Sequence, residues 1–239
     1  MLQAQDLNLV TLQLSIFTPN ISSFAASKAL GIVLSKYSQR YDGDVQALPL
    51  PEEVPLEIPR IVLQSKDKAY RLEISPARIN SLWLRTDNVK TETQEIVDIC
   101  KEVLEYYIQS MQIEVNRLGL VTIRVHQTQK PATLLSNKFC KPELIDQVFS
   151  SSENFEIHNH SIKNIENFVV NVWTRCKSGL IVNNDQTHSA LIVEQDLNTL
   201  AQDLEDRKFN LEEIKSFFSL MQLESQAILQ LYFPNNQIL

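Results

Sequence analysis

Within residues 9–16, apolar and polar residues alternate from Val10 onward. Every second side chain is apolar, and those between are Thr11, Gln13 and Ser15. A period of two predicts a strand with one buried face. The buried side chains of this strand should be Val10, Leu12, Leu14 and Ile16.

Three later segments carry apolar residues three and four positions apart instead. They span residues 26–37, 96–107 and 211–228, and this spacing predicts amphipathic helices. We expect the second helix to continue to about Met111, and a weaker helix is expected within 133–149, interrupted at Pro142. Further strands are expected at 60–64, 70–75, 80–85, 155–160, 168–176 and 190–194.

The same element order occurs in both halves of the chain. Residues 118–125 match residues 7–14 at four of eight positions, and each half runs strand, helix, three strands, helix. We therefore expect an internal duplication, with halves 1–115 and 116–239 forming one unit with a pseudo-twofold axis. The expected fold class is α+β, a mainly antiparallel sheet built from β-α-β-β-β-α units, with two long helices on one face.

One stretch resembles a known family. The run LQSKDKAYRLEISP at 63–76, followed by a helix and NRLGLV at 116–121, is similar to a sporadically distributed bacterial protein family of comparable length and unknown function. The resemblance covers residues 58–127. It implies a bacterial origin and a role associated with defence or mobile elements. Separately, the repeated element order is similar to the saddle of TATA-box-binding-protein-like folds, an analogy that implies nothing about function.

Composition removes several function classes. The net charge of −7 argues against nonspecific duplex binding. Only four glycines occur, far apart, so phosphate-binding loops of the Walker A or dinucleotide type are not expected. No apolar run approaches membrane-spanning length, and the first residues do not resemble a secretory signal, so no membrane association is expected. The three cysteines are far apart in sequence, which favours a reducing cytoplasm.

Catalytic and metal-binding patterns are scarce. We expect no catalytic residue, no cofactor and no metal. The segment EIHNH at 156–160 places two histidines on one face of a strand, and His126 could join them in a zinc site. No carboxylate or cysteine pair at standard ligand spacing completes such a site, so solvated histidines are the preferred interpretation.

Alternation also assigns side chains to the sheet face that the helices leave uncovered. Tryptophan beside arginine on such a face can hold a carboxylate, stack on a base or anchor a protein partner. Thr11, Gln13, Glu73, Thr122, Glu156 and Asn171 are expected on this face. The candidate binding residues there are Arg71, Trp83, Arg85, Arg124, His126, His158, His160, Trp173 and Arg175.

The preferred function is a non-enzymatic binding or adaptor protein that joins a protein partner in a multi-protein assembly. Two alternatives remain open. One is a protein that binds or processes single-stranded nucleic acid, and the other is a small-ligand or hydrolytic cavity closed by the N-terminal helix and the proline-rich connector at 48–59.

Overall fold

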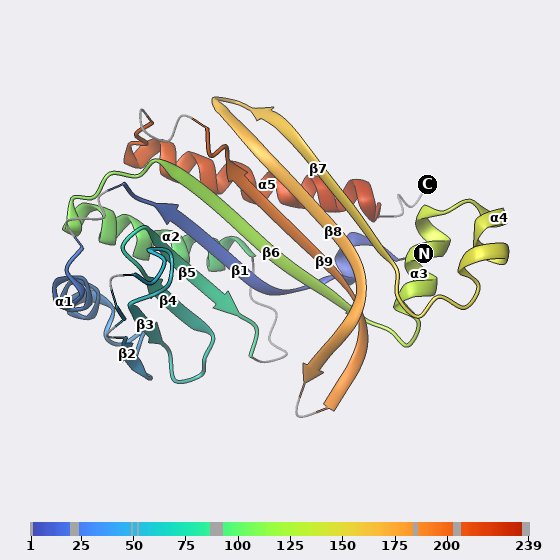
Figure 1. The fold of residues 1–239 in the computed structure, drawn as a ribbon, viewed down its shortest axis with the longest axis horizontal. Coiled ribbons are helices and arrows are strands. Elements are labelled where there is room, and N and C mark those ends of the chain that lie inside the picture. Colours follow the sequence, from blue (N-terminus) through green and yellow to red (C-terminus); the bar gives the residue numbers. More distant parts are fainter. Residues whose placement is uncertain are drawn as a thin grey trace.

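One antiparallel sheet organises the molecule. The computed structural model describes residues 2–19, 24–48, 50–51, 53–86, 93–183, 186–202 and 207–235. The nine strands of the sheet lie in the order β2-β3-β4-β5-β1-β6-β9-β8-β7. Strands β1 (Asn8–Phe17) and β6 (Arg117–Gln127) are central neighbours and run antiparallel (Figure 1).

The rest of the first half forms one flank of the sheet. Strand β2, which the sequence did not predict, is short and exposed. The three strands expected after the proline-rich connector are confirmed within a few residues. The elements are α1 (Ala26–Tyr37), β2 (Val45–Ala47), β3 (Ile61–Gln64), β4 (Tyr70–Ile74), β5 (Arg78–Leu84) and α2 (Thr93–Met111).

The second half forms the other flank, with longer strands than expected. Strands β8 and β9 form a hairpin that extends beyond the ends of β7 and β6 (Figure 1). The interrupted helix is confirmed as two short helices and a π-helical turn. The elements are α3 (Pro131–Phe139), α4 (Pro142–Leu144), the π turn (Ile145–Phe149), β7 (Glu156–Ile165), β8 (Phe168–Asn183), β9 (Gln186–Thr199) and α5 (Leu211–Tyr232).

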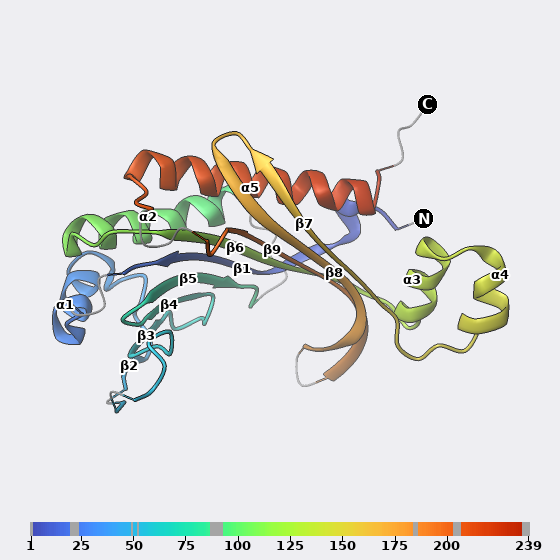
Figure 2. The same ribbon diagram turned by 45° about the horizontal axis from the view of Figure 1, so that its top comes forward.

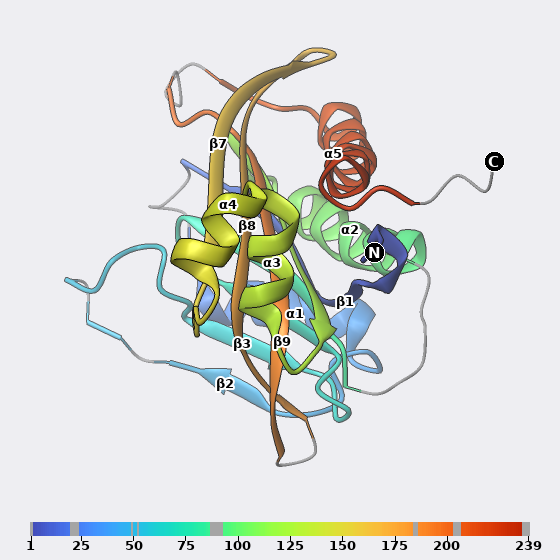
Figure 3. The ribbon, with the colours of Figure 1, turned by 90° about the vertical axis from the view of Figure 1, so that its right-hand side faces the viewer.

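Helices α2 and α5 cover one face of the sheet, which we call the covered face. Figures 2 and 3 show both helices on the same side of the strands. Their apolar stripes pack against one large core that includes Leu12, Leu14, Leu118 and Leu120. A smaller core lies near α3, around Leu135, Cys176 and Phe233. The structure is therefore α+β with a large antiparallel sheet, as expected.

The long helix α5 begins at a well-formed cap. The Asn210 side chain accepts a hydrogen bond from the backbone N–H of Glu213, and the Glu213 carboxylate accepts one from the backbone N–H of Asn210. Such a capping box satisfies two backbone donors at the helix start. Among the described residues, no helix is long and apolar enough to cross a membrane.

Strand register decides which side chains face the helices. Leu12 lies opposite Trp83 on β5 and opposite Thr122 on β6, so these three side chains share the covered face. A register shift between Leu9 and Thr11 marks a β-bulge, which reverses the alternation at that point. Thr11 and Thr122 are equivalent in the sequence match between the halves, but because of this bulge they lie on opposite faces.

Candidate functional site

The uncovered face carries five of the nine candidate binding residues. Arg71 on β4, and His158, His160, Trp173 and Arg175 on β7 and β8, alternate with side chains that point toward the helices. Thr11, Gln13, Glu73, Glu156 and Asn171 lie on the same side.

Trp83 and Arg85 are not on this face, contrary to expectation. Trp83 is only 4% exposed and belongs to the main core. Arg85 follows β5, donates from Nε to the Leu9 carbonyl oxygen at 2.7 Å, and lies 5.7 Å from the Trp83 ring centroid. A large aromatic ring is stabilised by burial between strand and helices, and here the strand register placed it there.

The sequence prediction also assigned the two faces of β6 the wrong way round. Thr122 and Arg124 are buried beneath α5, where Arg124 Nη1 donates to Thr122 Oγ1 at 2.7 Å and to Gln195 Oε1 at 3.0 Å. Ser225 of α5 completes this Arg124 cluster by donating to Gln195 Oε1 at 2.9 Å. Polar side chains tolerate burial where they bond to one another, so polarity alone misassigned the strand.

His126 follows the same phase as Arg124. It lies opposite Leu191, a buried residue of the smaller core, and its Nδ1 is 3.2 Å from the Asp6 carbonyl oxygen. It therefore lies on the covered side of the sheet and does not face His158 or His160. Among the described residues, no three His, Cys, Asp or Glu side chains are placed to hold a metal ion.

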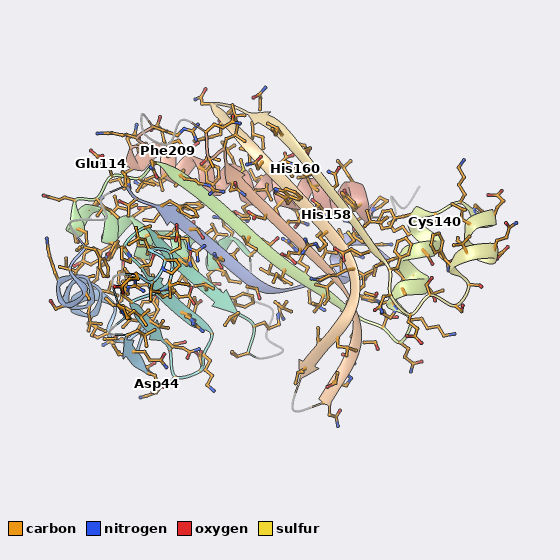
Figure 4. The ribbon with its side chains drawn as sticks, in the orientation of Figure 1. Asp44, Glu114, Cys140, His158, His160 and Phe209 are labelled. Carbon is orange, nitrogen blue, oxygen red and sulfur yellow. The ribbon has the colours of Figure 1, made fainter. Side chains whose placement is uncertain are left out.

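The remaining aromatic candidates form an aromatic ledge of His158, His160 and Trp173. The His160 and Trp173 rings stack in parallel, 3.9 Å apart and inclined by 7°, and the His158 ring lies 4.8 Å from Trp173. Figure 4 shows the two histidines following one another along β7. Trp173 remains 37% exposed, which is unusual for so large a ring.

Cations beside this ledge are matched by carboxylates. Arg175 Nε lies 2.8 Å from Glu156 Oε1, and its Nη1 lies 3.7 Å from Glu194 Oε2. Lys177 Nζ also lies 3.4 Å from Glu194. The ledge is therefore an aromatic surface whose neighbouring charges are balanced, not a basic patch.

A cavity of about 550 Å³ lies at the other end of the uncovered face. It lies where β1 ends and where β5 and β6 begin, and Glu57 of the connector forms part of its wall. We call it the arginine cavity, because Arg78 and Arg117 are its basic lining residues. Its other lining residues used below are Gln13, Phe17, Gly119, Asp196 and Asn198.

Hydrogen bonds connect the arginine cavity to the ledge. Arg117 Nη2 donates to Asn198 Oδ1 at 2.9 Å, and Asn171 Nδ2 approaches the same oxygen at 3.4 Å. Asn171 Oδ1 lies 3.2 Å from Nε2 of His160, which stacks on Trp173. One series of hydrogen bonds therefore joins the arginine cavity to the aromatic ledge.

A second set of hydrogen bonds connects the cavity to Arg71. Arg71 pairs with Glu73 at 2.8 Å, and Glu73 accepts from Asn80 Nδ2 at 3.1 Å. Asn80 Oδ1 in turn accepts from Ser15 Oγ at 2.8 Å, and Gln13 Nε2 donates to Ser15 Oγ at 2.9 Å. These bonds hold the cavity floor in a defined geometry.

Arg78 and Arg117 were missed from the sequence. Arg78 lies two residues before the strand expected at 80–85, and Arg117 lies directly before the match at 118–125. The structure starts β5 and β6 at these arginines and places both opposite Phe17 of β1. Only pairing between distant strands brings them together, so no local pattern could have identified the pair.

Comparisons with known proteins identify no family for this chain. No protein-family model matches it, and no curated protein matches it. Among solved structures, one match is the di-domain ARO/CYC StfQ from the steffimycin biosynthetic pathway, with 8% identity over 93% of this chain and 95% of that chain. Its TM-score of 0.19 is too low to support an inference about fold or function.

Proposed function

We propose that this chain is a non-enzymatic binding protein that docks onto a protein partner through the uncovered face of its sheet. The observation that carries the proposal is the exposed Trp173 ring, held rigid by stacking on His160. Rigid, exposed aromatic side chains are the residues that anchor protein interfaces most often.

Apolar residues beside the ledge support a protein partner. Ile162 is 59% exposed and Val169 is 42% exposed, on the uncovered side of the β7–β8 hairpin. Together with Trp173 they form an apolar stripe with charged and polar residues around it, the usual arrangement of an interface core and rim. Single-stranded nucleic acid is a weaker match, because the Arg175 and Lys177 side chains are already paired with glutamates.

We extend the proposal to the evolutionary origin of the chain and to its cellular compartment. Apart from the extra edge strand β2, the sheet order is symmetric about the β1–β6 pair, which supports an internal duplication of halves 1–115 and 116–239. The three cysteines are free, which supports a cytoplasmic setting. The resemblance of residues 58–127 to a bacterial family is the basis on which we propose a role for this assembly in bacterial defence or mobile-element biology.

Affinity capture with matched variants tests the docking face. We expect a protein captured by the wild type to be lost with Trp173→Ala and retained with Leu223→Ala, an exposed apolar residue of α5 on the opposite side. Removal of a central aromatic anchor typically weakens binding by about 2 kcal/mol or more, about 30-fold. Reconstitution of the pair from purified components then confirms direct binding.

Two outcomes would contradict this proposal. Capture that is equal for Trp173→Ala and the wild type would place the interface elsewhere. Salt-sensitive binding of a single-stranded oligonucleotide, measured by fluorescence anisotropy and lost in Trp173→Ala, would favour nucleic acid as the partner. Circular dichroism of both variants checks that they remain folded.

A further inference from the structure

Two arginines converge on one aromatic ring at the arginine cavity. Phe17 lies opposite Arg78 on one side and opposite Arg117 on the other. The guanidinium carbons lie 5.8 Å and 4.9 Å from the centroid of the Phe17 ring. Cation–π contacts on both sides of the ring therefore hold two positive charges at the same cavity.

Neither guanidinium forms an ion pair with a carboxylate that the structure describes. Within the described part of the chain, no carboxylate lies within ion-pair distance of Arg78 or Arg117. Arg117 donates instead to neutral oxygens, the Thr199 carbonyl at 3.3 Å and Asn198 Oδ1 at 2.9 Å. The Nε of Arg78 is buried and has no hydrogen-bond partner among the described side chains and backbone groups.

The positive charges of this pair are only partly compensated. Burial has the largest effect on the pKa of Arg117 and lowers it, the Asp196 carboxylate raises it, and the neighbouring Arg78 lowers it by less than Asp196 raises it. Asp196 accepts from Asn198 Nδ2 at 2.9 Å, and Asn198 Oδ1 in turn accepts from Arg117. An anion between the two arginines would reduce their mutual repulsion and accept hydrogen bonds from them.

The cavity floor leaves room for such an anion. Gly119 lies in the middle of the floor, between Ser15 and Asn198. An added Cβ there would meet only ordinary contacts, the nearest being Asn198 Cβ at 3.5 Å. The glycine is therefore not required for packing of the sheet, and its missing side chain deepens the cavity.

We infer that the arginine cavity binds a small oxyanion, a carboxylate or a phosphate, between Arg78 and Arg117. Guanidinium groups present paired N–H donors that match the oxygens of both anions. A volume of about 550 Å³ is in the range of small-ligand sites. The side chains of Gln13 and Asn198 also line the cavity, beside the neutral part of the ligand. The inference does not depend on a protein partner at the ledge.

Isothermal titration calorimetry tests this site with two probes, inorganic phosphate and succinate, each against sodium chloride at matched ionic strength. We expect saturable binding of at least one probe to the wild type. Binding should weaken about tenfold or more in Arg78→Gln and in Arg117→Gln, because each loses charge-assisted hydrogen bonds. The probe that binds more tightly distinguishes phosphate from carboxylate as the preferred group.

Two variants keep the test decisive. Gly119→Ala fills the floor without disturbing packing and should also weaken binding, even if an arginine variant fails to fold. Arg175→Gln is the matched control, because it removes an arginine of the same face that lies outside the cavity. Heats equal to those of sodium chloride, or equal binding by Arg78→Gln and the wild type, would overturn the inference. Neither outcome of the calorimetry would affect the capture of a protein partner through Trp173, so the two proposals can fail separately.

Discussion

The two tryptophans lie on opposite faces of one sheet, although alternation assigned both to the same face. Trp83 on β5 lies opposite Leu12 and is buried beneath the helices, whereas Trp173 on β8 lies opposite Asp196 and remains exposed. The side chain is the same and only the register differs. Alternation therefore divides a strand into two faces, but it does not determine which face is buried.

The arginines show the same contrast. Arg124 is buried among neutral oxygens of the covered face, and burial lowers its pKa to about 10. Arg117, seven residues earlier on β6, lines the arginine cavity of the other face. Strand β6 therefore contributes Arg124 to an internal polar cluster on one face and Arg117 to a candidate ligand-binding cavity on the other.

The largest expected effect is in thiol reactivity, which tests the face assignment of β8 through Cys176. Burial raises the pKa of Cys100 and of Cys176 to about 12, so both are protonated thiols at pH 8, whereas Cys140 is only half-buried. We expect Cys140 to react fast with Ellman's reagent. Cys100 and Cys176 should react only when the protein unfolds, and therefore more slowly by about 10³-fold or more.

Cys140→Ser is the control for this experiment, because it should remove the fast reaction alone. Cys176 lies on the covered face of β8, between positions whose side chains point away from the helices. Fast labelling of Cys176 would put β8 in the opposite phase, and with it Trp173.

Substitution of the two tryptophans should affect stability very differently. Trp83→Ala removes a fully packed ring and should lower the free energy of unfolding by about 3–5 kcal/mol. Trp173→Ala removes a partly exposed ring together with its stacking on His160, and should lower it by only about 1 kcal/mol. Urea unfolding followed by circular dichroism measures both. Similar losses in the two variants would mean that both rings are core residues, and the ledge would not be a binding surface.

The smallest expected effect concerns Arg124. Arg124→Met removes a buried charge that has no acidic partner among the described residues, while Gln195 and Ser225 still bond to each other. We expect the free energy of unfolding to rise by about 1 kcal/mol. Arg175→Met on the exposed face is the control and should leave stability unchanged. A loss of stability in Arg124→Met would show that the cluster depends on the guanidinium.

Local patterns were sufficient for most elements of this chain. The helices Thr93–Met111 and Leu211–Tyr232 have apolar stripes long enough to be recognised directly, and the first strand alternates almost without error. The hairpin β8–β9 was underestimated, because its outer part pairs only with itself and lacks the apolar alternation of a strand against a core. Strand β2 was missed because all three of its residues are exposed.

The sequence by itself determined the α+β class, the element order and the positions of the aromatic and basic side chains. Tertiary structure alone decided which faces these side chains occupy and which of them meet. The physical reason is that side-chain spacing is a local property of the backbone, whereas register depends on pairing between strands far apart in the chain. That pairing buried Trp83 and Arg124, exposed Trp173, and brought Arg78 and Arg117 together around Phe17.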